Sequence, residues 1–321
     1  MADRERPLPG GCAFDTAPEL AVVVLAVGAP PELDAALRSL ARQSVPLEVV
    51  VVNSGGGDPH SALPENDPNV KIISVPHLLW PGAARNAGIR ASRAPWVAFM
   101  ASDHVAKDDW AAARLERHRQ GCRAVACAVV NSHPRSLCAW ANHLGILVRR
   151  LPGVPARDAL RYGASYARSL FEEYGYFRED LRIGEDTEFN ERLAGPDLPV
   201  WAPAVQTIHL NPTRLRQMLK SQFDRGRRTG LYWSPAKRGS LAVRAYRRFV
   251  SIARLSGKSV RGFDRCMAIA SWPLLFVGVC AYQLGVDAGR RDRAVPGNRG
   301  EYGGRFAHRL LRWGSLNRKE P

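Results

Sequence analysis

Short, continuous apolar runs recur along the first two-thirds of the chain, each bounded by turn-forming or polar residues. Such runs are typical of strands that are covered on both faces of a sheet. The expected strands are Leu20–Val27, Leu47–Val52, Val70–Val75, Trp96–Met100, Arg123–Val130 and Val200–His209. Helical segments separate several of these strands, so the pattern predicts an α/β fold with a mostly parallel sheet flanked by helices.

The helical segments are recognised by their periodicity and by their first residues. Pro31 opens the first of them, and Leu33, Leu37 and Leu40 fall on one of its faces. The segment Pro81–Ala91 carries several alanines, which permit close packing against a sheet. Further helices are expected at Trp110–Gln120 and Ala164–Tyr174, whereas residues 131–165 are left unassigned.

Charge is distributed very unevenly along the chain. The formal net charge is +16, but residues 212–321 hold 24 of the 46 Lys and Arg and only 6 of the 30 Asp and Glu. We therefore expect a flexible N-terminal segment at 1–19, an α/β domain at 20–211 and a basic helical region at 212–321. A near-neutral body with a basic tail indicates a partner that the tail alone contacts.

The basic region contains a segment suited to a membrane surface. Leu241–Arg265 interleaves arginines with apolar residues, as interfacial helices do. The uncharged run Met267–Val286 would reach about 30 Å as a helix, which is the thickness of the hydrocarbon layer. It could span the membrane, lie in the interface or pack as a buried helix. We expect contact with an anionic membrane surface and none with nucleic acid, because no nucleic-acid-binding motif is present.

The cysteines and the first residues indicate the compartment. The six cysteines form no C-x-x-C pair and no zinc-finger grouping, which is typical of reduced thiols. Residues 1–19 lack the apolar core of a secretory signal. We therefore expect a cytoplasmic protein associated with the inner face of the cell membrane.

Two candidate ligand sites follow predicted strands. Asp103 comes just after Trp96–Met100, at the end of the strand where α/β sheets bind ligands. One carboxylate suffices for a divalent cation when a bound phosphate supplies further oxygens. The alternative is that Asp103 caps a helix beginning near Val105. The glycine-rich segment Asn53–Asp58 either brings its backbone close to a ligand or is only a turn.

Two further candidates lie later in the chain. Either Glu185 or Asp186 faces inward as a general base, or both lie in the solvated first turn of a helix, where the helix dipole favours them. His209 is either an additional metal or phosphate ligand or a structural residue. The other histidines show no ligand spacing.

In their order and spacing, these motifs resemble family 2 glycosyltransferases over about residues 20–226. The matching segments are Ser39–Gln43, Val51–Asp58, Pro81–Ile89, Ala101–Asp103, Gly184–Asp186, His209 and Gln222–Gly226. Two positions depart from the family pattern. Asn53 replaces the first acid of the segment that holds the nucleotide base, and Ala101 replaces the first acid of the Asp-x-Asp motif.

The resemblance implies a GT-A fold, and it implies inverting transfer of a sugar from a nucleotide diphosphate sugar. It places Asn53, Arg85, Ser102 and Asp103 against the nucleotide sugar. Asp103 would also hold Mg²⁺ or Mn²⁺, with His209 as an additional ligand.

For catalysis, the resemblance implies that Asp186 is the base, with Glu185 beside it. The favoured donor is a UDP-sugar and the acceptor a glycan or a lipid-linked molecule, in cell-surface polysaccharide or glycolipid synthesis. Trp140 and the pair Arg149-Arg150 either line an acceptor cleft or cover the sheet. Because two acids are replaced, a non-catalytic sugar-nucleotide-binding or scaffolding protein that retains the fold is the alternative function.

Overall fold

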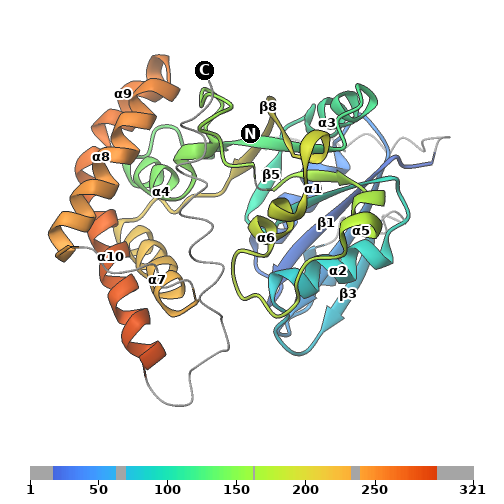
Figure 1. The fold of residues 1–321 in the computed structure, drawn as a ribbon, viewed down its shortest axis with the longest axis horizontal. Helices are drawn as coiled ribbons and strands as arrows, with labels where there is room; N and C mark the ends of the chain where they lie inside the picture. The colour runs from blue at the N-terminus through green and yellow to red at the C-terminus, as the bar shows by residue number, and fades with distance from the viewer. Residues whose placement is uncertain (1–16, 63–69, 162, 233–238, 295–321) are drawn as a thin grey trace, which may run out of the picture.

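The computed structural model describes residues 17–62, 70–161, 163–232 and 239–294 of the 321-residue chain. Most of the segment 1–19, predicted to be flexible, and the end of the basic region therefore lie outside the described residues. Figure 1 shows a sheet enclosed by helices beside a separate group of C-terminal helices.

The sheet has eight strands in the order β3-β2-β1-β4-β7-β6-β8-β5. Their bounds are β1 Leu20–Val27, β2 Leu47–Ser54, β3 Val70–Val75, β4 Trp96–Ala101, β5 His104–Ala106, β6 Ala124–Asn131, β7 Ser165–Ala167 and β8 Val200–His209. Strand β1 is parallel to β2 and β4, β2 to β3, and β6 to β8, while β7 and β5 are antiparallel to their neighbours. The prediction of a mostly parallel α/β sheet is confirmed.

Helices cover both faces of this sheet, because alternate residues of each strand point into different cores. Leu20, Val22 and Val24 enter the core beneath α1 and α3, whereas Ala21 and Val23 enter the core beneath α2, α5 and α6. The bounds of these helices are α1 Glu32–Ala41, α2 Pro81–Ala91, α3 Trp110–Arg119, α5 Ser169–Tyr174 and α6 Glu185–Arg192. Short 3₁₀ turns occur at Pro59–Ala62, Val148–Arg150 and Gly195–Asp197.

The helix predicted at Ala164–Tyr174 is wrong in its first half. Residues Ser165–Ala167 form β7, which is fully buried and bridges β4 and β6 by antiparallel pairing. Long-range pairing of this three-residue strand overrides the local pattern. Within the unassigned segment 131–165, the helix α4 (Leu137–Leu147) begins at Ser136, whose hydroxyl accepts a hydrogen bond from the Ala139 N–H.

The C-terminal helices form a third core together with α4. They are α7 Leu215–Tyr232, α8 Leu241–Ser259, α9 Gly262–Ala270 and α10 Trp272–Ala294. Helices α7 and α10 approach so closely that a Cβ on any of four glycines would overlap a carbonyl oxygen of the other helix. These glycines are Gly226 and Gly230 of α7 and Gly285 and Gly289 of α10.

The run Met267–Val286 is not one straight helix. It is divided between α9 and α10, whose axes differ by 56°. Pro273 lies in the first turn of α10, where backbone N–H groups have no partner within the helix, so its lack of an N–H costs no hydrogen bond. The same residue prevents α9 from continuing through this position, because an interior proline breaks a helix. Among the described residues, no single helix is long and apolar enough to cross a membrane, and only the bent pair α9–α10 reaches that length and apolarity.

Candidate functional site

The site is built at the edge where the parallel strands end. The register of β1 aligns Ala26 with Asn53 of β2 and Leu25 with Ala101 of β4, so both neighbouring strands end beside it. Ser102 and Asp103 then form a two-residue turn into β5. Because a strand follows Asp103, this residue does not cap a helix, and the nearest later helix begins at Trp110.

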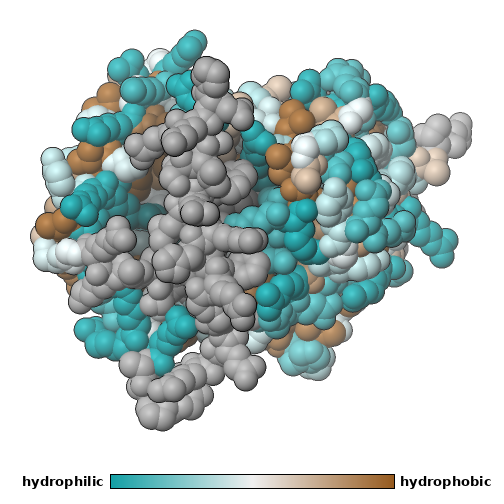
Figure 2. All heavy atoms as spheres, in the orientation of Figure 1, coloured by the Kyte–Doolittle hydropathy of each residue, from teal (hydrophilic) through white to brown (hydrophobic). Residues whose placement is uncertain are grey.

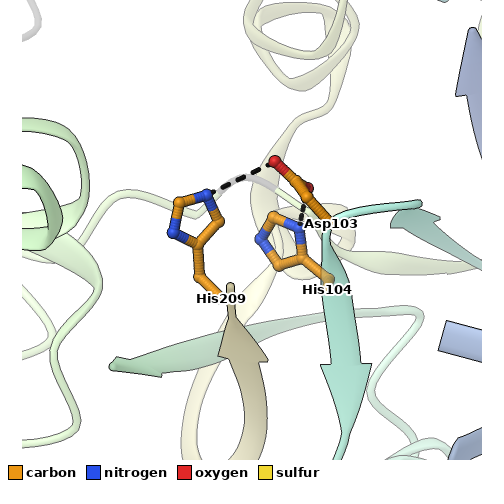
Figure 3. A group of neighbouring side chains, drawn as sticks. All are labelled: Asp103, His104 and His209. Carbon is orange, nitrogen blue, oxygen red and sulfur yellow. Dashed lines mark hydrogen bonds and ion pairs between the residues drawn. The ribbon is translucent and has the colours of Figure 1, made fainter. Parts of the chain in front are cut away.

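Asp103 lies within a cluster of three potential metal ligands. Antiparallel pairing of β5 with β8 makes His104 the cross-strand partner of His209. His104 Nδ1 lies 2.6 Å from Asp103 Oδ1, and His209 Nε2 lies 3.5 Å from Asp103 Oδ2 (Figure 3). One atom from each of the three residues lies within 4.8 Å of the others. The predicted pair Asp103 and His209 is thus brought together, and His104 joins it.

His104 was not predicted from the sequence. Its only local signal is its position next to Asp103, and its nearness to His209 arises from pairing between strands about one hundred residues apart. Burial lowers the pKa of His104, which favours the neutral imidazole that binds metals. Burial alone would raise the pKa of Asp103, but hydrogen bonds from His104 and His209 outweigh it and lower that pKa, so the carboxylate is ionised.

A second layer of side chains fixes the ring of His209. Its Nδ1 lies 2.8 Å from Asn211 Oδ1. The Asn211 amide is oriented by its Nδ2, which donates to the His209 carbonyl and to Asn131 Oδ1. Oδ1 therefore has to accept, so Nδ1 of His209 donates to Asn211 and Nε2 is the ring nitrogen that faces the carboxylate of Asp103. A cation that takes the place of the proton between Nε2 and the carboxylate would have a ligand on each side.

This donor set distinguishes between the two predicted cations. Two imidazole nitrogens and one carboxylate suit a transition metal such as Mn²⁺ better than Mg²⁺, which prefers oxygen ligands. The residues present therefore fit a divalent cation.

The side chain of Asn53 connects two loops by hydrogen bonds. It is fully buried, accepts a hydrogen bond from Ala29 N and donates one to the Gly56 carbonyl. It thereby ties the turn after β1 to the glycine-rich loop after β2. The loop residues Gly55, Gly56 and Gly57 all have positive φ, which glycine adopts without strain. Binding of a nucleotide by Asn53 stays a prediction.

Arg85 is joined to the acidic pair rather than to Asp103. Its Nη1 lies 2.9 Å from Glu185 Oε1, and its guanidinium lies over the rings of Phe99 and Phe177. Burial raises the pKa of Glu185, and the neighbouring charge of Asp186 adds to this rise. Within the part of the chain that the structure describes, no hydrogen bond or ion pair links Arg85 to Asn53 or Asp103. Contact between Arg85 and a nucleotide also stays a prediction.

The two acids of α6 have different surroundings. Glu185 is buried beneath Arg85, whereas Asp186 is half-buried and forms part of the wall of a cavity. Gly184 begins the helix with a φ of 83°, a conformation that turns the chain sharply before Glu185. The inward-facing acid with access to a ligand is thus Asp186.

The cavity has a volume of about 1320 Å³ and lies between α6, α4 and the helices α7, α8 and α10. Arg149 lines it, whereas Trp140 is buried in the third core and donates to the Pro134 carbonyl. Arg149 therefore lines a cavity and Trp140 packs with the C-terminal helices, while the use of this segment as an acceptor cleft stays a prediction. Sequence reasoning missed this cavity, because helices distant in sequence form its walls.

Comparisons with known proteins identify the domain. Residues 21–175 match the family model described as Glycosyl transferase family 2. The succinoglycan biosynthesis protein ExoO of Rhizobium meliloti (strain 1021) is 32% identical over 191 residues, which cover 54% of this chain and 55% of the relative. The chain thus spans about half the length of that curated relative.

The fold is also similar to that of a solved structure. The mannosyltransferase PcManGT from Pyrobaculum calidifontis, in complex with GDP-Man and Mn²⁺, matches with a TM-score of 0.51 and 19% sequence identity. The match covers 94% of this chain and 81% of that chain. At this identity the likeness concerns the fold alone, which is GT-A-like. Residues 21–175, the part of the chain that the family model matches, are a glycosyl transferase family 2 domain.

Proposed function

We propose that this protein transfers a sugar from a nucleotide diphosphate sugar to an acceptor hydroxyl with inversion at the anomeric carbon. The observation that carries the proposal is the cluster of Asp103, His104 and His209 at the carboxyl edge of a family 2 sheet. The favoured donor is a UDP-sugar. The name of the succinoglycan relative supports a role in polysaccharide or glycolipid synthesis, with a glycan or lipid-linked acceptor.

Asp103, His104 and His209 would hold the cation. A divalent cation bound there supplies positive charge that stabilises the leaving diphosphate. The family position occupied by Ala101 has lost its acid, and His104 offers the cluster a nitrogen donor in compensation. Mn²⁺ is the expected cation, and the presence of Mn²⁺ in the PcManGT complex agrees with that expectation.

Asp186 would act as the general base. It lies on the cavity wall, where an acceptor hydroxyl can approach, and it takes the proton of that hydroxyl as the oxygen attacks the anomeric carbon. Attack from the face opposite the diphosphate inverts the configuration. Arg85 holds the buried charge of Glu185, which leaves Asp186 as the acid directed to the cavity.

A panel of nucleotide sugars tests the proposal. Wild-type protein is incubated with UDP- and GDP-sugars and either Mn²⁺ or Mg²⁺, and release of the nucleoside diphosphate is measured. We expect release with at least one donor, faster with Mn²⁺, and inverted product by NMR. If the protein binds a donor but releases no nucleoside diphosphate with any donor and cation, the result would support the alternative of a non-catalytic sugar-nucleotide-binding or scaffolding protein. The presence of Ala101 in place of an acid favours that alternative.

Attachment to the inner face of the cell membrane is part of the same proposal. Helices α8 to α10 expose several large apolar side chains among arginines, and Figure 2 shows hydrophobic patches between polar ones over α8 and α9. The exposed apolar residues are Val243, Tyr246, Phe263, Ile269, Phe276, Val277 and Leu284. Such a surface supports an interfacial position, where apolar groups enter the lipid and arginines contact anionic head groups.

A further inference from the structure

The cavity beside Asp186 carries a strong excess of positive charge. Seven cationic residues line it but only two carboxylates, Asp158 and Asp186. The cationic residues are Arg149, Arg225, Arg228, Arg247, Arg248, Arg254 and Lys258. Within the described ranges, none of these seven forms an ion pair with a carboxylate.

Two arginines elsewhere on the same helices are neutralised. Arg227 of α7 pairs with Asp292 at 2.7 Å, and Arg244 of α8 pairs with Asp287 at 2.6 Å. The two paired arginines therefore face α10, whereas the arginines of α7 and α8 that line the cavity have no carboxylate partner in the described part of the chain. A cluster of like charges is unfavourable unless an anion is bound among them.

Arg248 is held at the cavity by contacts with α4 and α10. Arg248 Nη2 donates to the Gly145 carbonyl at 2.9 Å, and its guanidinium lies 4.1 Å from the ring centroid of Tyr282. The Tyr282 hydroxyl in turn donates to Thr229 Oγ1, one residue from Arg228. These contacts fix Arg248 beside α7 and α10 while leaving other guanidinium hydrogens for a ligand.

Arg225 shares this environment. Its side chain opens onto the cavity, and enclosure by the surrounding protein lowers its pKa, as do the nearby charges of Arg248 and Arg228. The charge of Asp186 acts on Arg225 in the opposite direction, so the two residues are electrostatic neighbours.

The remaining walls of the cavity are largely apolar. They include Ile146, Val148, Leu160, Ile183, Val250 and Leu255. A ligand that fits both the cationic and the apolar walls carries a concentrated negative charge next to an apolar chain. The cation cluster of Asp103, His104 and His209 is a separate group, and none of its members lines this cavity.

We infer that the cavity binds the acceptor through a phosphate or diphosphate group held by Arg225, Arg228 and Arg248, with an alkyl chain against the apolar walls. This inference rests on the proposed function, since it names the acceptor class for the hydroxyl that Asp186 deprotonates. Arginine suits the task, because its planar donors pair with phosphate oxygens in a fixed geometry.

Binding of decyl diphosphate to the full chain tests the inference. Titration calorimetry below the critical micelle concentration is performed in EDTA, so that no cation recruits the diphosphate to the Asp103 cluster. We expect the double variant Arg225→Gln/Arg228→Gln to raise the Kd about tenfold or more and high salt to weaken binding. The matched control is Arg216→Gln, an exposed arginine of α7 outside the cavity, which should bind like wild type.

Three comparisons decide the outcome. Equal affinity of the double variant and wild type would overturn the arginine site. If decanol binds as tightly as decyl diphosphate, the phosphate has no role in binding. If inorganic diphosphate binds as tightly as decyl diphosphate, the apolar walls have no role in binding. Release of nucleoside diphosphate from the donor without acceptor, measured in parallel on wild-type protein, reports on the proposed function independently, because this reaction needs no acceptor.

Discussion

The orientation of His209 depends on one side-chain amide. Asn211 accepts a hydrogen bond from His209 Nδ1, which directs Nε2 toward Asp103. Asn142 and His143 of α4 also bond Asn211, so the ring is held from two elements. A cation that binds between His209 and Asp103 thus meets ligands already in place, and little ordering is needed on binding.

At this scale, the substitution His209→Ala should lower the affinity for Mn²⁺ at least about tenfold, because one of few protein ligands is lost. The measurement is the Mn²⁺ EPR signal of the free ion during titration. The control is His133→Ala, which removes an exposed histidine outside the cluster and should leave the affinity unchanged. Equal affinity of all three proteins would place the cation elsewhere.

At the scale of elements, the packing of α7 on α10 depends on glycine. Gly226, Gly230, Gly285 and Gly289 let the two backbones approach each other, and this pairing positions Arg225 and Tyr282 beside the cavity. A methyl group at any of the four positions would have to displace a helix backbone rather than a flexible side chain.

Gly226→Ala should therefore lower the free energy of unfolding by about 1–3 kcal/mol through overpacking. Gly257→Ala in α8 is the matched control, since the nearest atom to its Cβ would be a side-chain carbon of Trp272 at 4.0 Å. There alanine should stabilise by about 0.5–1 kcal/mol, because glycine is the weaker helix former. Urea unfolding of both variants checks the prediction, and it is contradicted if Gly226→Ala is as stable as the wild type.

Local sequence patterns predicted the elements that depend on local burial. The continuous apolar runs of β1, β2 and β4 identified their strands, since both faces of these strands are covered. The strand β7 and the ligand His104 were not predicted, because antiparallel pairing between distant segments determines both. The bend between α9 and α10 had a local signal in Pro273, whereas the basic cavity had none, because it exists only after α7, α8 and α10 pack.

At the scale of the whole molecule, charge and apolar exposure coincide in the C-terminal helices. Residues 212–321 carry 24 Lys and Arg against 6 Asp and Glu, and α8 to α10 expose aromatic and aliphatic side chains. A membrane held by this surface would lie near the cavity, because α8 and α10 contribute to both. An acceptor with an alkyl chain would then reach Asp186 from the lipid.

The full chain should sediment with vesicles that contain phosphatidylglycerol and much less with phosphatidylcholine alone, and salt should weaken this binding. Replacing both Phe263 and Phe276 by serine removes two exposed aromatic groups and should weaken it further. The control is Leu78→Ser, an exposed apolar residue near the sheet. Retention of all variants in the supernatant with both vesicle types would contradict membrane attachment.

The substitution Asp186→Asn tests whether Asp186 is the base of a sugar transfer. The amide keeps the shape of the side chain but cannot take the proton, so kcat should fall about 10²–10⁴-fold. The Kd for the nucleotide sugar should stay within about twofold of wild type, and Asp224→Asn, on the exposed pair with Lys220, should change neither. An Asp186→Asn protein that transfers sugar at the wild-type rate would rule out Asp186 as the base.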